Sequence, residues 1–420
     1  MDIQNARDEL GYEPQYSFHE YLEDYKKEQK LKRFDRLWSQ KRQQAFGGEN
    51  MKCDIAIIGA SYLQLPLILK AKEMGFRTHV FAWAAGDVGE KAADVFYPIS
   101  IIEKEQITEK CRQIGVCGIC SIASDLAVVT VNYAAEKLGL CGNSMESTYK
   151  STNKYQMRQA FKKRSDPCPE SLLVDDSFSM ADLDISFPVI VKPTDRSGSR
   201  GIFKVERAED LEKAVSMAAA QSLEKKALIE EFVCGEEYSV EYISFKGVHS
   251  FLAVTKKYTT GAPHFIETGH LEPAPIDEAT QTRIKAVVEH ALDTLEIKNG
   301  ASHSEIKIDS SGEIRIIEIG ARMGGDCIGS DLVRYSTGYD YLKMVIQTAC
   351  GEAPDFTKDK DTVSAESLFI FSQADLDELE RLRREEPQNL LRIADLHPER
   401  IGAITDSSNR AGCYIRTARR

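Results

Sequence analysis

Residues 303–319 read HSEIKIDSSGEIRIIEI, two alternating apolar and polar stretches around a turn-forming DSSG segment. Such a pattern predicts a β-hairpin. A symmetric turn would place Glu305 opposite Ile316, with Glu318 diagonal to Glu305 on the same face. Two carboxylates this close are unfavourable unless a proton or a cation intervenes, and carboxylates on a rigid hairpin suit Mg²⁺ (or Mn²⁺) bridging to nucleotide phosphates. The alternative is a surface hairpin whose glutamates face water.

A glycine loop between two short strands comes earlier in the chain. Residues 187–193, FPVIVKP, form an apolar strand with Lys192 near its end, and SGSRG at 197–201 leads into a second strand at 202–205. Small residues let the backbone approach an oligophosphate and direct consecutive N–H groups at it. The same segment is also compatible with an ordinary hairpin turn, so the loop alone does not decide for phosphate binding.

A third segment has features of a nucleoside site. Residues 228–241 read LIEEFVCGEEYSVE, two strand-like stretches around a glycine. Backbone groups at a strand edge can bind the edge of adenine, and a carboxylate a few residues later can accept both ribose hydroxyls. This interpretation points to Glu230, Val233 and Glu237, although acidic residues beside a turn are also typical of a solvated face.

The chain from Met51 alternates strand-like and helix-like periods, which predicts a parallel sheet with right-handed crossovers. The expected strands are 54–58, 78–82 and 116–122, and the expected helices are about 63–74 and 126–138. The turn after the first strand reads GASYLQ and has Ser61 and Gln64 where a dinucleotide fingerprint has glycines. This argues against a nicotinamide-dependent dehydrogenase.

Composition sets further limits. The length of 420 residues predicts more than one domain. The formal net charge of −12 argues against nucleic acid as a partner. No apolar run reaches the ~20 residues that span a bilayer, so no membrane partner is expected. The ten cysteines are scattered and no secretory signal is evident, which predicts reduced thiols and a cytoplasmic location.

Taken together, five motifs resemble those of the ATP-grasp superfamily. In chain order they are Asn153-Lys154 before a helix, Val191-Lys192-Pro193, the loop at 197–201, the EEFV segment with Glu237, and Glu305 followed by EIGAR at 318–322. The chain looks most similar to the L-amino acid ligase branch of carboxylate–amine ligases. Two segments carry this finer resemblance: Glu267-Thr268-Gly269-His270 before the hairpin and Arg322-Met323-Gly324-Gly325 after it.

The resemblance implies a mixed α/β and α+β architecture. We expect a parallel-sheet (pre-ATP-grasp) domain over 51–145, an ATP-grasp domain over 146–360 with a small lid subdomain at about 180–235, and a C-terminal antiparallel β-rich subdomain. Residues 361–420 would add a helix and a β-hairpin that pairs 401–405 with 413–417. The pattern of residues 1–50 predicts a charged helical extension that packs on the body or on a second copy in a homodimer. Part of this extension resembles the tail of nucleotide-sugar epimerases.

ATP and magnesium are the cofactors that the resemblance implies. The α- and β-phosphates would be held by Lys154 and Lys192. The β- and γ-phosphates would lie under Ser197, Gly198, Ser199 and Gly201 of the loop. Adenosine would be bound by Glu230, Val233 and Glu237.

The resemblance also implies the reacting end of the site. The metal ligands would be Glu305 and Glu318, with Glu267 near the metal or an amino group. The acyl phosphate and its oxyanion would be surrounded by His270, Arg322 and the Gly325 backbone. One departure is Gly320, because many ATP-grasp enzymes carry asparagine at this place, two residues after the second glutamate.

The expected activity is therefore ATP-dependent joining of a small-molecule carboxylate, that of an amino acid, to an amine through an acyl phosphate, with release of ADP and phosphate. One alternative is an enzyme similar to carbamoyl-phosphate synthetase or to purine-pathway ATP-grasp enzymes. Another is a non-catalytic nucleotide-binding module. The Glu267 and His270 pair favours the amino acid ligase, and retention of both lysines and both hairpin glutamates argues against a non-catalytic module.

Overall fold

The computed structural model describes residues 53–175, 177–179, 185–196, 198, 200–262, 265–402 and 410–418. The chain divides into two units, Met1–Cys53 and Asp54–Arg420, and the second is described here. The expected N-terminal helix lies outside the described residues.

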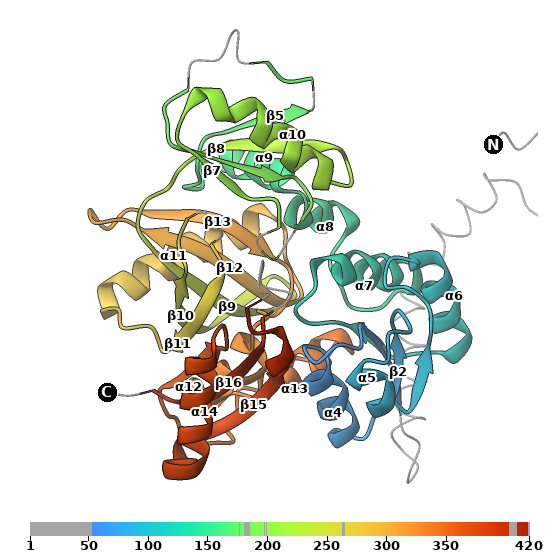
Figure 1. The fold of residues 1–420 in the computed structure, drawn as a ribbon. Helices are drawn as coiled ribbons and strands as arrows, with labels where there is room; N and C mark the ends of the chain where they lie inside the picture. The colour runs from blue at the N-terminus through green and yellow to red at the C-terminus, as the bar shows by residue number, and fades with distance from the viewer. Residues whose placement is uncertain are drawn as a thin grey trace, which may run out of the picture. The chain divides into compact units, whose positions relative to one another are not determined.

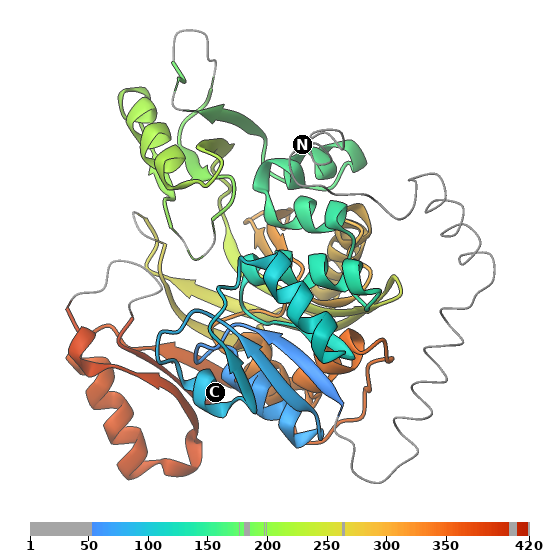
Figure 2. The same ribbon diagram turned by 90° about the vertical axis from the view of Figure 1, so that its right-hand side faces the viewer.

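A parallel sheet opens the described part of the chain, as predicted. Its strand order is β3-β2-β1-β4, formed by β1 (Asp54–Ile58), β2 (Arg77–Phe81), β3 (Val95–Tyr97) and β4 (Gly118–Cys120). The helices after these strands are α4 (Leu65–Glu73), α5 (Val88–Ala92), α6 (Lys104–Ile114) and α7 (Asp125–Leu138). Alternate residues of β1 enter different cores, because Ile55 and Ile57 pack with α4 while Ala56 and Ile58 pack with α6 and α7. Helices therefore cover both faces of this sheet (Figure 2).

Two helices lead into a small antiparallel sheet. Helix α8 (Met145–Thr152) is followed by α9 (Lys154–Arg164), whose N-cap Asn153 accepts a hydrogen bond from the backbone N–H of Gln156 at 3.1 Å. The sheet has the order β5-β8-β6-β7, with β5 (Ser171–Asp175), β6 (Val189–Pro193), β7 (Phe203–Val205) and β8 (Lys226–Glu231). Helix α10 (Leu211–Gln221) packs on it. The glycine loop joins β6 to β7, which confirms that it connects two paired strands.

The second sheet has eight strands in the order β13-β12-β9-β10-β11-β14-β16-β15 and fills the centre of Figure 1. The strands are β9 (Glu236–Phe245), β10 (Val248–Thr259), β11 (Glu267–Glu272), β12 (Gly300–Ile308), β13 (Ile314–Gly320), β14 (Ala365–Phe369), β15 (Leu390–Leu396) and β16 (Gly412–Thr417). Helix α11 (Glu278–Thr294) shares a core with Val240 and Tyr242 of β9, whereas α13 (Tyr341–Ala349) shares another with Ile243. The sheet is thus covered on both faces. Helices α12 (Val333–Thr337) and α14 (Gln373–Glu385) complete the C-terminal region.

The register of the β12–β13 hairpin differs from the prediction. Ile306, not Glu305, lies opposite Ile316, and an irregularity between Glu305 and Ile306 brings Glu305 directly opposite Glu318. Ile308 lies opposite Ile314 and not Glu313, so the turn is longer than predicted, and the Asp309 carboxylate accepts the backbone N–H groups of Ser311 and Glu313 within it. The predicted Glu305–Ile316 pairing is therefore wrong, and the two carboxylates lie closer than the expected diagonal.

The C-terminal hairpin also needs correction. β16 pairs with β14 on one side and with β15 on the other, so its partner in the hairpin is Leu390–Leu396 rather than residues 401–405. Residues 403–409 lie outside the described part of the chain. The antiparallel, β-rich character of this region is as predicted.

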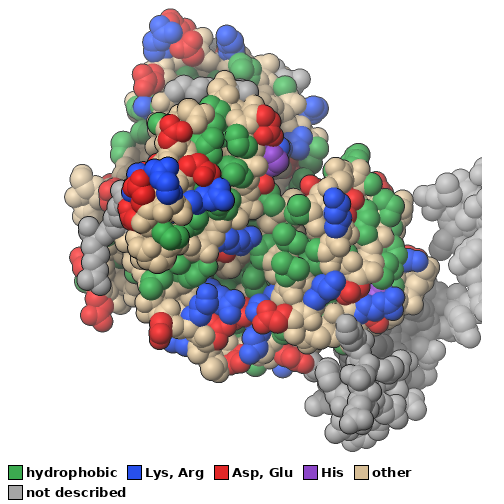
Figure 3. All heavy atoms as spheres, turned by 60° about the horizontal axis from the view of Figure 1, so that its bottom comes forward, with side chains coloured by type: hydrophobic (Ala, Val, Ile, Leu, Met, Phe, Trp, Pro, Cys, Tyr) green, Lys and Arg blue, Asp and Glu red, His purple; other side chains and the backbone are tan. Residues whose placement is uncertain are grey.

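Among the helices of the described residues, none combines the length and apolar character needed to cross a bilayer. On the face shown in Figure 3, lysine and arginine side chains are interspersed with aspartate and glutamate. Basic and acidic groups thus alternate over this face.

Candidate active site

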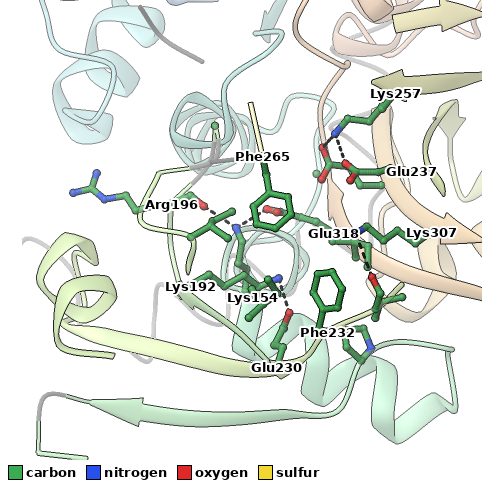
Figure 4. A pocket seen from close by; sticks show the side chains of 18 of the residues that line it. Lys154, Lys192, Arg196, Glu230, Phe232, Glu237, Lys257, Phe265, Lys307 and Glu318 are labelled. Carbon is green, nitrogen blue, oxygen red and sulfur yellow. Dashed lines mark hydrogen bonds and ion pairs between the residues drawn. The ribbon is translucent and has the colours of Figure 1, made fainter. Parts of the chain in front are cut away.

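A cleft with a cavity volume of about 160 Å³ lies between the small sheet and the edge of the large one. Its lining comes from both sheets: Lys192 and Glu230 to Val233 from β6, β8 and the turn after β8, and Glu237, Lys257, Glu267, His303, Glu305, Lys307, Glu318 and Arg322 from β9 to β13 and beyond. Figure 4 shows several of them, among them Lys192, Glu230, Glu237, Lys257 and Glu318, around the cleft. The two lysines, the adenosine residues and the metal ligands predicted from sequence thus lie in one place.

Lys192 belongs to a buried cluster of three charges. Its Nζ lies 2.6 Å from Oε2 of Glu230, and Nε of Arg158 lies 2.9 Å from Oε1 of the same carboxylate. Burial raises the pKa of Glu230, but the two cations outweigh it and hold that pKa below its ordinary value. The carboxylate of Glu230 is therefore engaged with two protein cations.

Lys154, the first residue of α9, connects the two sheets. Its Nζ donates to Oε1 of Glu318 at 2.7 Å and to the carbonyl of Arg196 at 2.7 Å. Its backbone N–H donates to the carbonyl of Thr194 at 2.8 Å. The ammonium group thus lies between strand β13 and the start of the glycine loop.

The turn after β8 lines the part of the cleft where the sequence predicts the adenosine site. The carbonyl of Val233 accepts a hydrogen bond from Nζ of Lys307 at 3.2 Å. The ring of Phe232 lies under two ammonium groups, at 4.6 Å from Lys204 and 5.4 Å from Lys307. An aromatic face and a strand edge at this end provide an apolar surface with polar groups beside it, as a purine requires.

The hairpin carboxylates face a third lysine. Nζ of Lys257 lies 2.7 Å from Oε1 of Glu305, 2.8 Å from Oε1 of Glu237 and 4.0 Å from Oε1 of Glu267. Burial alone would lower the pKa of Lys257, but attraction from the carboxylates exceeds that effect and raises the pKa well above its usual value. Lys257 is therefore a permanent cation in the cleft.

Behind Glu305 lies a chain of polar contacts. Nε2 of His303 is 3.5 Å from Oε1 of Glu305, and its Nδ1 is hydrogen-bonded to Glu241, which is fully buried. The other oxygen of Glu241 accepts the backbone N–H of Gly324 at 3.0 Å. Burial lowers the pKa of His303, but Glu241 and Glu305 together raise it to about 8. These contacts link the β12–β13 hairpin, which carries the predicted metal ligands, to the loop that follows it.

The hairpin carboxylates fit one magnesium ion. Glu305 and Glu318 are cross-strand neighbours on one face, and Mg²⁺ is commonly held by one or two carboxylates with phosphates and water completing its shell. The described residues contain no cluster of three or more His, Cys, Asp or Glu side chains arranged to hold a metal by themselves. Phosphate oxygens would therefore have to supply the remaining ligands.

Arg322 is held at the other end of the cleft. Its Nε lies 2.9 Å from Oδ1 of Asp125, and its Nη2 lies 3.2 Å from Oδ2. Asp125 is the first residue of α7, so a carboxylate at a helix N-terminus fixes the guanidinium in a bidentate pair. Burial opposes the charge of Arg322, but Asp125 outweighs it and raises the pKa of Arg322.

His270 lies on β11 outside the lining of the cleft. It is 1% exposed, and neither ring nitrogen has a hydrogen-bond partner among the described residues. Its Nε2 is 3.7 Å from Oδ2 of Asp326, whose other oxygen accepts from Nη2 of Arg410 at 2.5 Å. Arg410 also lies 3.6 Å from the ring centroid of Phe369. His270 therefore belongs to a neighbouring buried cluster.

The other predicted site residues fall in three places. Glu267 and Gly198 line the cleft, and Gly201 adopts φ of 71° beside it. Ser197 and Ser199 lie outside the described residues. Gly325 is close to Ala123 and is not part of the cleft lining.

Sequence reasoning did not single out the residues that partner the predicted ones. These are Asp125, Arg158, Glu241, Lys257, His303 and Arg410. A sequence signal existed for Lys257, because a charged pair interrupts the otherwise strand-like run LAVTKKYT at 252–259. The others depend on contacts between segments far apart in the chain.

Comparison with known proteins agrees with this geometry. Residues 185–331 match the model of the family described as ATP-grasp domain. The chain is 26% identical over 295 residues to alanine–anticapsin ligase of Bacillus subtilis (strain 168), a match covering 64% of this chain and 62% of that ligase. It spans less than two thirds of the length of this curated relative.

Solved structures show the same fold. L-amino acid ligase from Bacillus licheniformis superposes with a TM-score of 0.73 at 22% identity, covering 88% of this chain and 94% of that one. N5-carboxyaminoimidazole synthetase from Staphylococcus aureus, solved with ADP, gives 0.70 at 16% identity, covering 88% and 95%. The ATP-grasp fold predicted from the motifs is thereby confirmed, and the similarity to named ligases agrees with the predicted branch.

Proposed function

We propose that this ATP-grasp protein is an ATP- and magnesium-dependent ligase that converts a small-molecule carboxylate into an acyl phosphate and joins it to an amine. The observation that carries the proposal is the direct pairing of Glu305 with Glu318 in a cleft that also holds Lys154, Lys192 and Lys257. Convergent carboxylates and ammonium groups suit the phosphates of a nucleotide and their metal ion.

The nucleotide would lie with its base beside Phe232 and Val233 and its ribose near Glu237. Lys154 and Lys192 would reach the α- and β-phosphates from one side, and the loop with Gly198 and Gly201 would cover the outer phosphates. Both lysines are anchored, by Glu318 and Glu230, so little rotamer freedom is lost when phosphates bind.

Phosphoryl transfer requires mainly positioning and charge neutralisation. Magnesium, when bound by Glu305 and Glu318, would neutralise charge on the phosphate oxygens. The lysines would hold the terminal phosphate in line with the carboxylate that attacks it. The products of this step are ADP and an acyl phosphate.

The amine would then attack the acyl phosphate and release phosphate. Arg322 is fixed by Asp125 at the end of the cleft and can donate to the developing oxyanion. One well-placed donor of this kind contributes roughly 3–4 kcal/mol. The role at the acyl phosphate that the resemblance implies for His270 is not supported by its place outside the cleft lining, whereas Glu267 lines the cleft and we assign it to an amino group or the metal.

An amino acid is the substrate we propose, because the chain resembles alanine–anticapsin ligase and an L-amino acid ligase. We place the reaction in the cytoplasm, where scattered cysteines such as the ten of this chain stay reduced.

The proposal is tested by incubating the protein with ATP, Mg²⁺ and pooled amino acids, then measuring phosphate release and product mass. Glu318→Ala should abolish turnover, and Lys192→Ala should strongly weaken nucleotide affinity. Lys162→Ala is the matched control, because Lys162 is exposed on α9 and pairs only with the exposed Glu170. Unchanged turnover in Glu318→Ala would contradict the proposal. Phosphate release in the presence of bicarbonate, but not of any amino acid, would favour the carbamoyl-phosphate-synthetase-like alternative.

A further inference from the structure

We propose that Lys257 supplies, as a fixed ammonium group, the positive charge that a second metal ion would bring to the nucleotide phosphates. The site would then work with a single divalent ion. This inference rests on the proposed function and deepens it, because it assigns the cations of the same cleft.

The first argument is the position of Lys257. Its side chain is 4% exposed, and its Nζ lies 2.7 Å from Glu305 and 2.8 Å from Glu237. These carboxylates belong to the metal hairpin and to the proposed ribose contact, so the ammonium group lies between the two ends of the phosphate chain. Figure 4 shows Lys257 across the cleft from Lys154 and Lys192. Bound phosphates would thus meet a protein cation on both sides.

The second argument is that position 320, at the end of β13, supplies no side-chain metal ligand. Position 320 is glycine, and a Cβ built there would lie 3.0 Å from Oδ1 of Asp125 and 3.2 Å from Nε of Arg322. The bidentate Asp125–Arg322 pair therefore fills the space that a longer side chain at 320 would need. A side chain at position 320 would require that pair to shift, and the glycine present offers no side-chain oxygen to a metal ion.

The third argument concerns the free oxygens of the hairpin. Oε1 of Glu305 is contacted by Nζ of Lys257 and lies 3.5 Å from Nε2 of His303. Oε1 of Glu318 is likewise contacted by Lys154. Each carboxylate thus has one oxygen next to a protein cation. The other oxygens suffice for one ion shared between two carboxylates, and the lysines complete the neutralisation.

Counting bound ions tests the inference. The protein is mixed with a non-hydrolysable ATP analogue and titrated with Mn²⁺, and free Mn²⁺ is followed by electron paramagnetic resonance. We expect one Mn²⁺ per nucleotide-loaded chain. Lys257→Met should bind a second Mn²⁺, because it leaves Glu305, Glu237 and Glu267 around a point without a cation. Lys257→Arg retains the charge and should bind one.

Lys256→Met is the matched control. Lys256 precedes Lys257 on β10 and pairs with Glu236 at 2.9 Å, outside the cleft lining, so its loss should leave one Mn²⁺ bound. Two ions in the unaltered protein, or one ion in a folded Lys257→Met variant, would overturn the inference. If Lys257→Met does not fold, the count in the unaltered protein decides. If the protein binds no nucleotide, the proposed function fails as well, whereas nucleotide binding with two ions removes only the role of Lys257.

Discussion

Replacing Arg158 by methionine tests the electrostatic core of the cleft. Arg158 lies on α9, is 2% exposed, and its Nη2 donates to the carbonyl of Ile317 at 2.6 Å in addition to its ion pair with Glu230. Methionine keeps the apolar length of the side chain and removes its charge and donors. The variant therefore leaves Glu230 buried with one cation instead of two.

The size of the effect follows from these contacts. Removing one partner of a buried ion pair costs about 3–5 kcal/mol, because the remaining charge stays out of water. Lys192 remains 2.6 Å from Glu230 and limits the loss. A backbone carbonyl left without its donor adds about 1 kcal/mol or more. We expect the free energy of unfolding to fall by roughly 3–4 kcal/mol. We also expect nucleotide affinity to fall, because Glu230, without Arg158, holds Lys192 more firmly and Lys192 is then less available to the phosphates.

Urea unfolding followed by circular dichroism measures the first effect, and titration with a fluorescent ATP analogue measures the second. Lys162→Met on the same helix is the control, because Lys162 and Glu170 form an exposed pair at 3.1 Å whose loss should cost less than about 1 kcal/mol. Equal losses for Arg158→Met and Lys162→Met would refute the reasoning, since burial would then make no difference to the pair.

Two further predictions concern Glu272 and Asp125. Burial raises the pKa of Glu272 to about 8. Between pH 5 and 8 the folded protein therefore keeps a proton on Glu272 that the unfolded chain has lost. The free energy of unfolding should decline over this range by up to about 1.4 kcal/mol per pH unit. Glu272→Gln should remove that slope in urea unfolding at several pH values, and an unchanged slope would assign it to another group. Asp125→Asn should lower ligase turnover roughly 10²-fold by releasing Arg322, with nucleotide affinity unchanged. An equal loss of nucleotide affinity would show that Asp125 acts on the fold.

Much of the fold could be predicted because its signals are local. The alternation of apolar runs from Met51 predicted the parallel sheet, and the apolar strand before the glycine loop predicted the β6–β7 pair. The register of β12 and β13 could not be predicted, because it depends on how Asp309 closes the turn and on an irregularity beside Glu305. Neither feature changes the hydrophobic pattern that identifies the strands.

The site was predictable to the extent that its residues belong to short motifs. The cleft brings together Lys154, Lys192, Glu305 and Glu318 from four separate segments. The groups that orient them, such as Arg158, could not be found in this way. Arg158 meets Glu230 across 72 residues, and an arginine in a charged helix normally indicates a solvated face. Only the packing of α9 against the small sheet turns it into a buried partner.

The charges of the cleft explain why the nucleotide and its metal ion would bind together. Lys154, Lys192 and Lys257 are each paired with a carboxylate, at 2.7, 2.6 and 2.7 Å. A triphosphate entering alone would place its negative charges beside Glu318, Glu230 and Glu305, whose charges the three lysines already offset, and this repulsion is costly. A divalent ion that arrives with the phosphates and binds the other oxygens of the hairpin glutamates removes this repulsion, while the lysines keep their carboxylates. The paired arrangement therefore discriminates against metal-free nucleotide by electrostatics alone, in a chain whose net charge of −12 already repels anions.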